Sequence, residues 1–165
     1  MKVTSTAIVD GIMDPQYGKY GTQKGPHGRC TRSFPLLIED APEGTVSFAI
    51  IMEDKDAIPI NGYSWIHWTV ANLTRTELAA NESLTATDFV QVQNSLSGKI
   101  ANVDKELAIG YQGPGAPERP HIYETHVFAL DTMIDIEPGF YMNELYWKMK
   151  GHILDQYTLE GKYIN

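Results

Sequence analysis

Apolar residues gather in short runs that are typical of strands. Residues 45–52 (TVSFAIIM) are rich in β-branched and aromatic side chains and follow the turn-like stretch 40–44 (DAPEG). Residues 65–71 (WIHWTVA) and 121–130 (HIYETHVFAL) have the same character, and 107–111 is a shorter candidate. Clusters of Gly, Pro and Asn separate the runs, as expected of loops. The pattern predicts a mostly-β fold.

Helical periodicity is clear only near the end of the chain. Asn143 is a candidate N-cap, and Gly151 interrupts the pattern that follows it. One side of this helix would carry Leu145, Tyr146, Met149 and Ile153. A second short helix is expected near residues 76–78. Because strand signals dominate, we expect a β-sandwich or barrel-like core with one or two short peripheral helices.

The chain fits one domain, residues 1–165, since it has no repeat and no linker long enough to divide it. A chain of this length can bury about 70% of its unfolded surface. Its composition, with 42% hydrophobic and 21% charged residues, is that of an ordinary globular protein. Neither a metal nor a covalent cross-link is needed for such a core to form.

Charge and cysteine content narrow the function classes. Thirteen basic and 21 acidic residues give a net charge of −8, which disfavours binding to nucleic acid. Cys30 is the only cysteine, which is consistent with a reducing compartment. We find neither a signal-peptide core nor a run of about 18 apolar residues, so we expect a cytoplasmic protein without a membrane span.

Candidate site residues lie at the ends of two predicted strands. Side chains two residues apart in a strand share a face, so His121 and Tyr123 project together. Asp54 and Asp56 share a face if their segment continues the preceding strand. Taken alone, an Asp-x-Asp pair is more often a turn at a strand end, because Asp bonds to nearby backbone.

His67 lies within an aromatic strand and is expected to share a face with Trp65 and Thr69. A single strand histidine is more often structural than functional. The loop at 113–120 (GPGAPERP) is too rich in Gly and Pro for regular structure, and such loops commonly line sites on a rigid sheet.

The order of these motifs is more specific than any one of them. In sequence they are 33–36 (SFPL), 54–58 (DKDAI), 65–72 (WIHWTVAN), 110–117 (GYQGPGAP), 121–123 (HIY) and a tail at 151–163. Together they resemble the phosphatidylethanolamine-binding protein family, in particular its bacterial Raf-kinase-inhibitor-like branch. The resemblance runs from about residue 34 to residue 163.

The resemblance implies a β-sandwich with Greek-key connections and a surface pocket that receives phosphate-like groups. The family's motifs carry the ligand-binding role onto Asp54, Asp56, His67, His121 and Tyr123, with Gly113 and Pro114 in the loop that forms one wall. It also implies a homodimer. No cofactor or metal is implied.

The chain also departs from the family pattern. Lys55 and Ile58 replace both prolines of the D-P-D-A-P motif, and Ile122 replaces the Arg that usually follows the second His. An anion contact normally credited to that Arg is therefore in question. Arg119, in the preceding loop, is a candidate replacement.

An anion beside carboxylates poses an electrostatic question. A protonated phosphate can donate to Asp54 while His67, His121 and Tyr123 donate to its other oxygens. A phosphoethanolamine ligand could instead place its ammonium near a carboxylate. Because histidine changes charge near neutral pH, we expect tighter phosphate binding at pH 6 than at pH 8.

Two other function classes remain open. Asp54, Asp56, His67 and His121 could ligate Zn²⁺ or Mn²⁺ in a hydrolase. Alternatively, the domain inhibits a kinase or protease through a protein interface, with a partner that the sequence does not name. We find no activated nucleophile, since Cys30 has no neighbouring base and Ser64 lies in a loop. The expected function is therefore ligand binding rather than catalysis.

Overall fold

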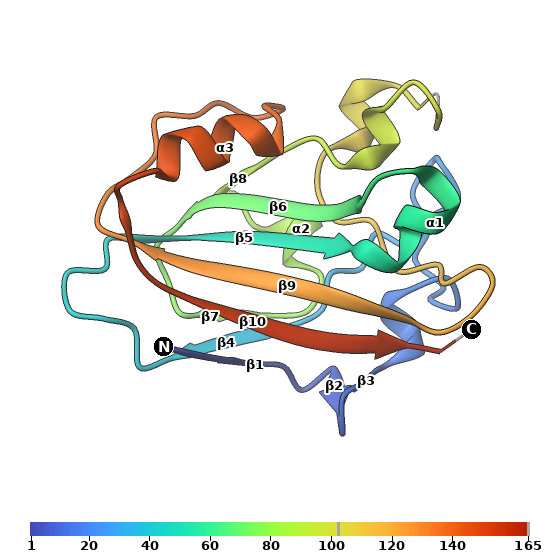
Figure 1. Ribbon diagram of the computed structural model, residues 1–165, viewed down its shortest axis with the longest axis horizontal. Coiled ribbons are helices and arrows are strands. Elements are labelled where there is room, and N and C mark those ends of the chain that lie inside the picture. Colours follow the sequence, from blue (N-terminus) through green and yellow to red (C-terminus); the bar gives the residue numbers. More distant parts are fainter. Residues whose placement is uncertain (102, 165) are drawn as a thin grey trace.

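Two β-sheets stack to form the body of the protein (Figure 1). The computed structural model describes residues 1–101 and 103–164. The smaller sheet has the order β1-β4-β7, and its strands are β1 (Lys2–Thr4), β4 (Leu36–Glu39) and β7 (Glu77–Leu78). The larger sheet has the order β2-β3-β10-β9-β5-β6-β8. Its strands are β2 (Ile8–Val9), β3 (Ile12–Met13), β5 (Ser47–Asp54), β6 (Trp65–Leu73), β8 (Val90–Gln91), β9 (His121–Leu130) and β10 (Ile153–Tyr163).

Helices are short and lie outside the sheets (Figure 1). The α-helices are α1 (Ile58–Asn61), α2 (Glu82–Thr85) and α3 (Met142–Met149). The 3₁₀ turns are η1 (Pro15–Tyr17), η2 (Lys55–Ala57), η3 (Ser95–Ser97) and η4 (Lys105–Ala108). The prediction of a mostly-β sandwich with short peripheral helices is confirmed.

The larger sheet is buried on both faces by alternating side chains. Along β5, Ile50 and Met52 face the core between the two sheets, while Ala49 and Ile51 face the opposite side. That second side is covered by α3, whose Leu145 and Met149 are fully buried, and by residues 134–140. This double coverage explains why 45–52 is a nearly continuous apolar run instead of a strict alternation.

Strand pairing brings distant segments to one end of the larger sheet. Asp54, the last residue of β5, lies opposite Tyr123 near the start of β9. It also lies opposite Trp65, the first residue of β6. Because both pairings are antiparallel, the end of β5 meets the beginnings of its two neighbours. Residues far apart in the chain thus converge at this end of the sheet.

Four local predictions are wrong. Asn143 is not the N-cap, because α3 begins at Met142 and Tyr141 occupies the cap position. Residues 107–111 were expected to form a strand, but residues up to 108 belong to the turn η4 and only Ile109 makes an isolated bridge, to Gln93. Residues 76–78 include strand β7 instead of a helix, and α2 begins four residues later. Ile153 starts β10 because Gly151 adopts φ +88°, which ends the helical path.

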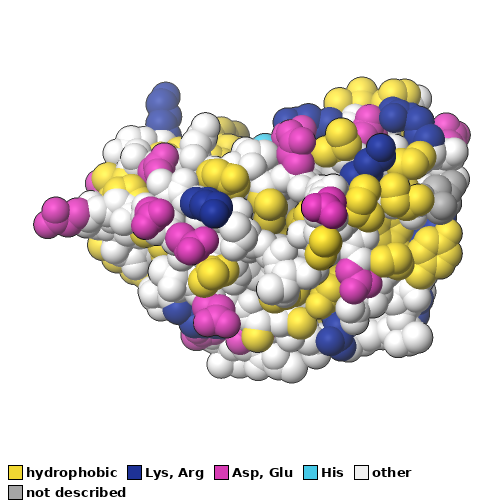
Figure 2. Space-filling view, turned by 90° about the horizontal axis from the view of Figure 1, so that it is seen from below, with side chains coloured by type: hydrophobic (Ala, Val, Ile, Leu, Met, Phe, Trp, Pro, Cys, Tyr) yellow, Lys and Arg dark blue, Asp and Glu magenta, His cyan; other side chains and the backbone are white. Residues whose placement is uncertain are grey.

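Acidic and basic side chains are interspersed over the face seen from below in Figure 2. Hydrophobic side chains are most numerous toward the right-hand end of that view. This face therefore has no continuous basic surface of the kind that nucleic acid would need. Within 1–101 and 103–164, none of the helices has the length and apolar character required to cross a bilayer.

Candidate functional site

A β-bulge turns His67 toward the interior of the sandwich. Pairing between β5 and β6 shifts at this point, since Met52 lies opposite Trp68 and the next residue, Glu53, lies opposite Ile66. His67 is therefore the additional residue, and a bulge of this kind reorients the side chain it carries. The expectation that His67 shares a face with Thr69 is wrong, because Thr69 lies opposite Ile51 on the other side of the sheet.

His121 and Asp54 form a buried pair at the floor of the site. The Nδ1 atom of His121 lies 2.8 Å from the Oδ2 atom of Asp54, and both side chains are at most 5% exposed. The other carboxylate oxygen of Asp54 accepts from the backbone N–H of Ala57, 3.1 Å away, which caps η2. Because a carboxylate only accepts, Nδ1 of His121 carries the hydrogen. Its Nε2 is buried and has no partner among the described residues.

Gln112 fixes the orientation of His67. Its backbone carbonyl lies 2.7 Å from the Nδ1 atom of His67 and can only accept, so Nδ1 donates. The Oε1 atom of Gln112 also accepts from the indole N–H of Trp65 at 2.9 Å. Burial lowers the pKa of His67 to about 4 despite the opposing effects of this hydrogen bond and of Asp54. The neutral ring therefore presents an unprotonated Nε2, in contrast to the donor role expected from the sequence.

Tyr123 lies between the two histidines. Its ring centroid is 5.0 Å from that of His67 and 6.3 Å from that of His121. Its hydroxyl oxygen accepts from the backbone N–H groups of Gly115 and Ala116, at 3.3 and 3.1 Å. Burial, followed by the nearby charge of Asp54, raises the pKa of Tyr123, so the hydroxyl stays protonated. This hydroxyl braces the 113–120 loop against β9.

These groups line an open cavity of about 630 Å³. Polar lining comes from Asp54, His67, Gln112, His121 and Tyr123, and the wall includes Gly115, Ala116 and Pro117. Lys19, His27 and Arg29 also line it, whereas Asp54 is the one carboxylate among its described lining residues. Cations thus outnumber carboxylates here, although the whole chain carries a net charge of −8. The local field favours an anion.

The sequence analysis missed the basic side chains of the cavity, although the sequence contains a signal for them. Residues 15–38 include four Lys and Arg residues and no Asp or Glu, in a chain where acidic residues are the more numerous. Arg29 is exposed, and a Cβ atom built on Gly115 would lie 3.6 Å from its Nη1 atom. This segment brings the positive charge to the loop that holds Tyr123.

Other residues expected at the site lie outside the cavity. Asp56 belongs to η2, beyond the strand, where its carboxylate accepts from Arg119 at 2.8 Å and from the backbone N–H of Ile122 at 2.9 Å. Arg119 therefore neutralises Asp56 and does not line the cavity. Gly113 and Pro114 lie behind the wall, since the backbone N–H of Gly113 donates to the Cys30 carbonyl and the Pro114 carbonyl accepts from the Lys19 backbone.

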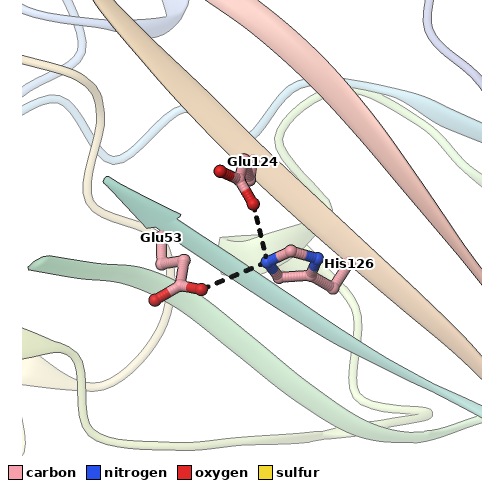
Figure 3. A group of neighbouring side chains, drawn as sticks. All are labelled: Glu53, Glu124 and His126. Atoms are coloured by element: carbon pink, nitrogen blue, oxygen red, sulfur yellow. Dashed lines mark hydrogen bonds and ion pairs between the residues drawn. The ribbon is translucent and has the colours of Figure 1, made fainter. Parts of the chain in front are cut away.

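The four residues considered for a metal-dependent hydrolase do not bring their ligand atoms together. Within the described part of the chain, one group of three has its ligand atoms within 4.8 Å of one another, and it consists of Glu53, Glu124 and His126 (Figure 3). These side chains lie on the face of the sheet opposite the cavity. The Lys55 ammonium lies 2.6 Å from Glu124 and 3.6 Å from Glu53, so it already supplies the compensating positive charge.

Comparisons with known proteins agree with one another. A family model described as phosphatidylethanolamine-binding protein matches residues 4–164. The Bacillus subtilis protein YxkA is 40% identical over 150 residues, which cover 88% of this chain and 89% of that protein. The Chlamydia trachomatis phosphatidylethanolamine-binding protein homolog CT736 superimposes with a TM-score of 0.80 at 30% identity, over 99% of this chain and 96% of that one. Escherichia coli YbcL has the same fold, with a TM-score of 0.75 at 24% identity over 99% and 98% of the two chains.

Proposed function

The chain belongs to the phosphatidylethanolamine-binding protein family, and we propose that its cavity binds a small ligand carrying a phosphate group. The observation that supports this most directly is the presence of Lys19 and Arg29 in a cavity lining that includes one carboxylate, Asp54, among its described residues. This excess of positive charge favours an anionic group on the ligand.

The dimensions of the cavity support a ligand of modest size. Pockets for small molecules usually enclose about 300–1,000 Å³, and this one encloses about 630 Å³. Arg29 presents a planar guanidinium suited to bidentate contact with phosphate oxygens. No carboxylate among the described residues forms an ion pair with Arg29, which leaves its charge available to a ligand.

The negative charge of Asp54 does not oppose this proposal. One of its oxygens accepts from His121 and the other from the backbone of Ala57, and both contacts lie at the floor of the cavity. Both carboxylate oxygens of Asp54 are therefore engaged by protein donors. Asp54 acts as a positioning residue that holds this ring in one orientation.

Calorimetric titration of phosphate and of phosphoethanolamine into the protein tests the proposal. We expect saturable binding with a dissociation constant of about 1 mM or tighter, which corresponds to about −4 kcal/mol. Arg29→Ala should weaken it at least threefold without affecting folding, because Arg29 is exposed. Lys150→Ala, which removes an exposed cation next to α3, is the matched control and should bind like the wild type.

A second pair of variants tests the floor of the cavity. His121→Ala should abolish binding, whereas His126→Ala should retain it, because His126 lies on the same strand but on the opposite face of the sheet. Circular dichroism and thermal melts test whether both variants fold. The absence of heat with both ligands in the wild-type protein would refute the proposed function.

A further inference from the structure

The histidine nitrogens that face the cavity have a defined hydrogen-bonding character. His67 donates through Nδ1 to the Gln112 carbonyl, and His121 donates through Nδ1 to Asp54. In a neutral imidazole, when one nitrogen is the donor the other is an acceptor. The buried His67 ring therefore offers an Nε2 acceptor to the cavity. An acceptor at the floor of an anion site would repel a ligand that brings only oxygen lone pairs.

The surrounding groups do not reverse this character. Charged and titratable side chains that face the two rings come from three segments of the fold: Asp54 on β5, Tyr123 on β9, and Lys19, His27 and Arg29 from the N-terminal segment. Burial is the largest cause that lowers the pKa of His67, the Gln112 hydrogen bond and Asp54 oppose it, and the positive charge of Arg29 adds a smaller effect in the same direction as burial. The Tyr123 hydroxyl is engaged with the loop backbone and with Asp54. Burial and the Gln112 contact therefore leave Nε2 of His67 as an acceptor.

We propose that the site selects its ligand by the hydrogen that the ligand carries, so that it takes a phosphate monoester in its protonated, singly charged form and rejects tetrahedral anions without a P–OH group. The P–OH group would donate to Nε2 of His67, and the remaining oxygens would accept from Arg29. This inference rests on the proposed function and deepens it, since it names the ionic form of the ligand and the residues that recognise that form.

A specific pH dependence follows from this selection. The second ionisation of a phosphate monoester has a pKa of about 6, so about half of the ligand is protonated at pH 6 and about 1% at pH 8. Apparent affinity should therefore fall about 50-fold between pH 6 and pH 8. The sequence analysis also predicted tighter binding at pH 6 than at pH 8. Here, however, the group that titrates is the ligand and not His67.

The experiment uses three anions that distinguish the effect of ligand charge from the effect of a hydrogen that the ligand can donate. Methyl phosphate can carry one P–OH group, whereas sulfate has two charges and no hydrogen, and dimethyl phosphate has one charge and no hydrogen. Calorimetry at pH 6 should give methyl phosphate an affinity at least about tenfold higher than that of either other anion, since an unpartnered polar atom costs about 1–3 kcal/mol. Titrations at pH 8 in buffers of different ionisation enthalpy should show uptake of about one proton per methyl phosphate.

Arg29→Ala is the matched variant for the contribution of charge. The substitution should weaken the binding of methyl phosphate and the binding of sulfate by similar factors, so the ratio of the two affinities should stay unchanged. A large change in that ratio would assign the selectivity to the guanidinium and overturn the inference.

Two outcomes separate this inference from the proposed function. If sulfate binds as well as methyl phosphate at pH 6 and both weaken toward pH 8, the proton resides on the protein. The inference then fails while phosphate binding stands. If none of the three probes binds at either pH, both the inference and the proposed function fail.

Discussion

The side chains of Asp54 and His121 are 67 positions apart in the sequence and meet through a contact of 2.8 Å. Their pairing joins the end of β5 to the start of β9 at the floor of the cavity. Asp54 also caps η2, so one carboxylate fixes both a histidine ring and the loop that follows β5. The residue therefore stabilises the fold and positions the site at the same time.

Asp54→Asn should lower the free energy of unfolding by about 1–3 kcal/mol, because two hydrogen bonds to a buried charged group are weakened. Urea denaturation measures this change. Asp56→Asn is the matched control. Its carboxylate is partly exposed and paired with exposed Arg119, so the loss should stay below about 1 kcal/mol. Equal losses in the two variants would contradict the structural role assigned to Asp54.

His67 should make the folded state less stable as the solution becomes acidic. Its pKa is about 4 in the folded protein, below its ordinary value of 6.5, so the unfolded chain binds this proton first. The contribution is fully present above about pH 6.5 and is lost as the pH falls to about 4. Between these limits wild-type stability should decline by about 2–3 kcal/mol more than that of His67→Gln.

Nuclear magnetic resonance of the His67 ring provides a direct test of this prediction. The ring should remain a neutral, Nδ1-protonated tautomer at pH 6. His152→Gln, which changes an exposed histidine, should keep the wild-type slope of stability against pH. A His67 ring that titrates near pH 6.5 would contradict the prediction.

Glu53 should contribute stability with its own pH window. A hydrogen bond from His126 is the largest cause that lowers the pKa of Glu53 to about 2, and burial opposes it. Because the folded pKa lies below the ordinary value of 4.5, the contribution is present above about pH 4.5 and is lost as the pH falls toward 2. Glu53→Gln should cost roughly 1–2 kcal/mol at pH 7, and the cost should shrink toward pH 2. Glu39→Gln, at an exposed strand position, should change little at any pH.

Gly113→Ala should destabilise the protein by about 1–3 kcal/mol, because overpacking displaces well-packed neighbours. Its added Cβ would lie 2.5 Å from the Tyr17 carbonyl oxygen and 2.8 Å from the Cys30 Cβ. Gly115→Ala in the same loop meets only Arg29, at an ordinary 3.6 Å, and should melt near the wild-type temperature. Thermal unfolding compares the two, and equal melting temperatures would contradict the close packing at Gly113.

The fold class and the main strands follow from the amino-acid pattern alone. The run 121–130 coincides with β9, and 65–71 lies within β6, because long β-branched and aromatic runs favour a buried strand wherever they pair. Alternation along β9 also predicted that His121 and Tyr123 share a face, and both are buried beside the cavity. These features depend on local periodicity, which a sequence displays directly.

The chemistry of the site depends on contacts between distant segments of the folded chain. The bulge at His67 depends on how β6 pairs with β5, and a shift of one residue changes the face to which a side chain points. The donor and acceptor roles of His67 depend on the Gln112 carbonyl, 45 positions away in the sequence. The sharing of one cavity by Arg29 and the histidines depends on loop packing. Such relationships arise from contacts between distant segments, and for that reason local pattern does not encode them.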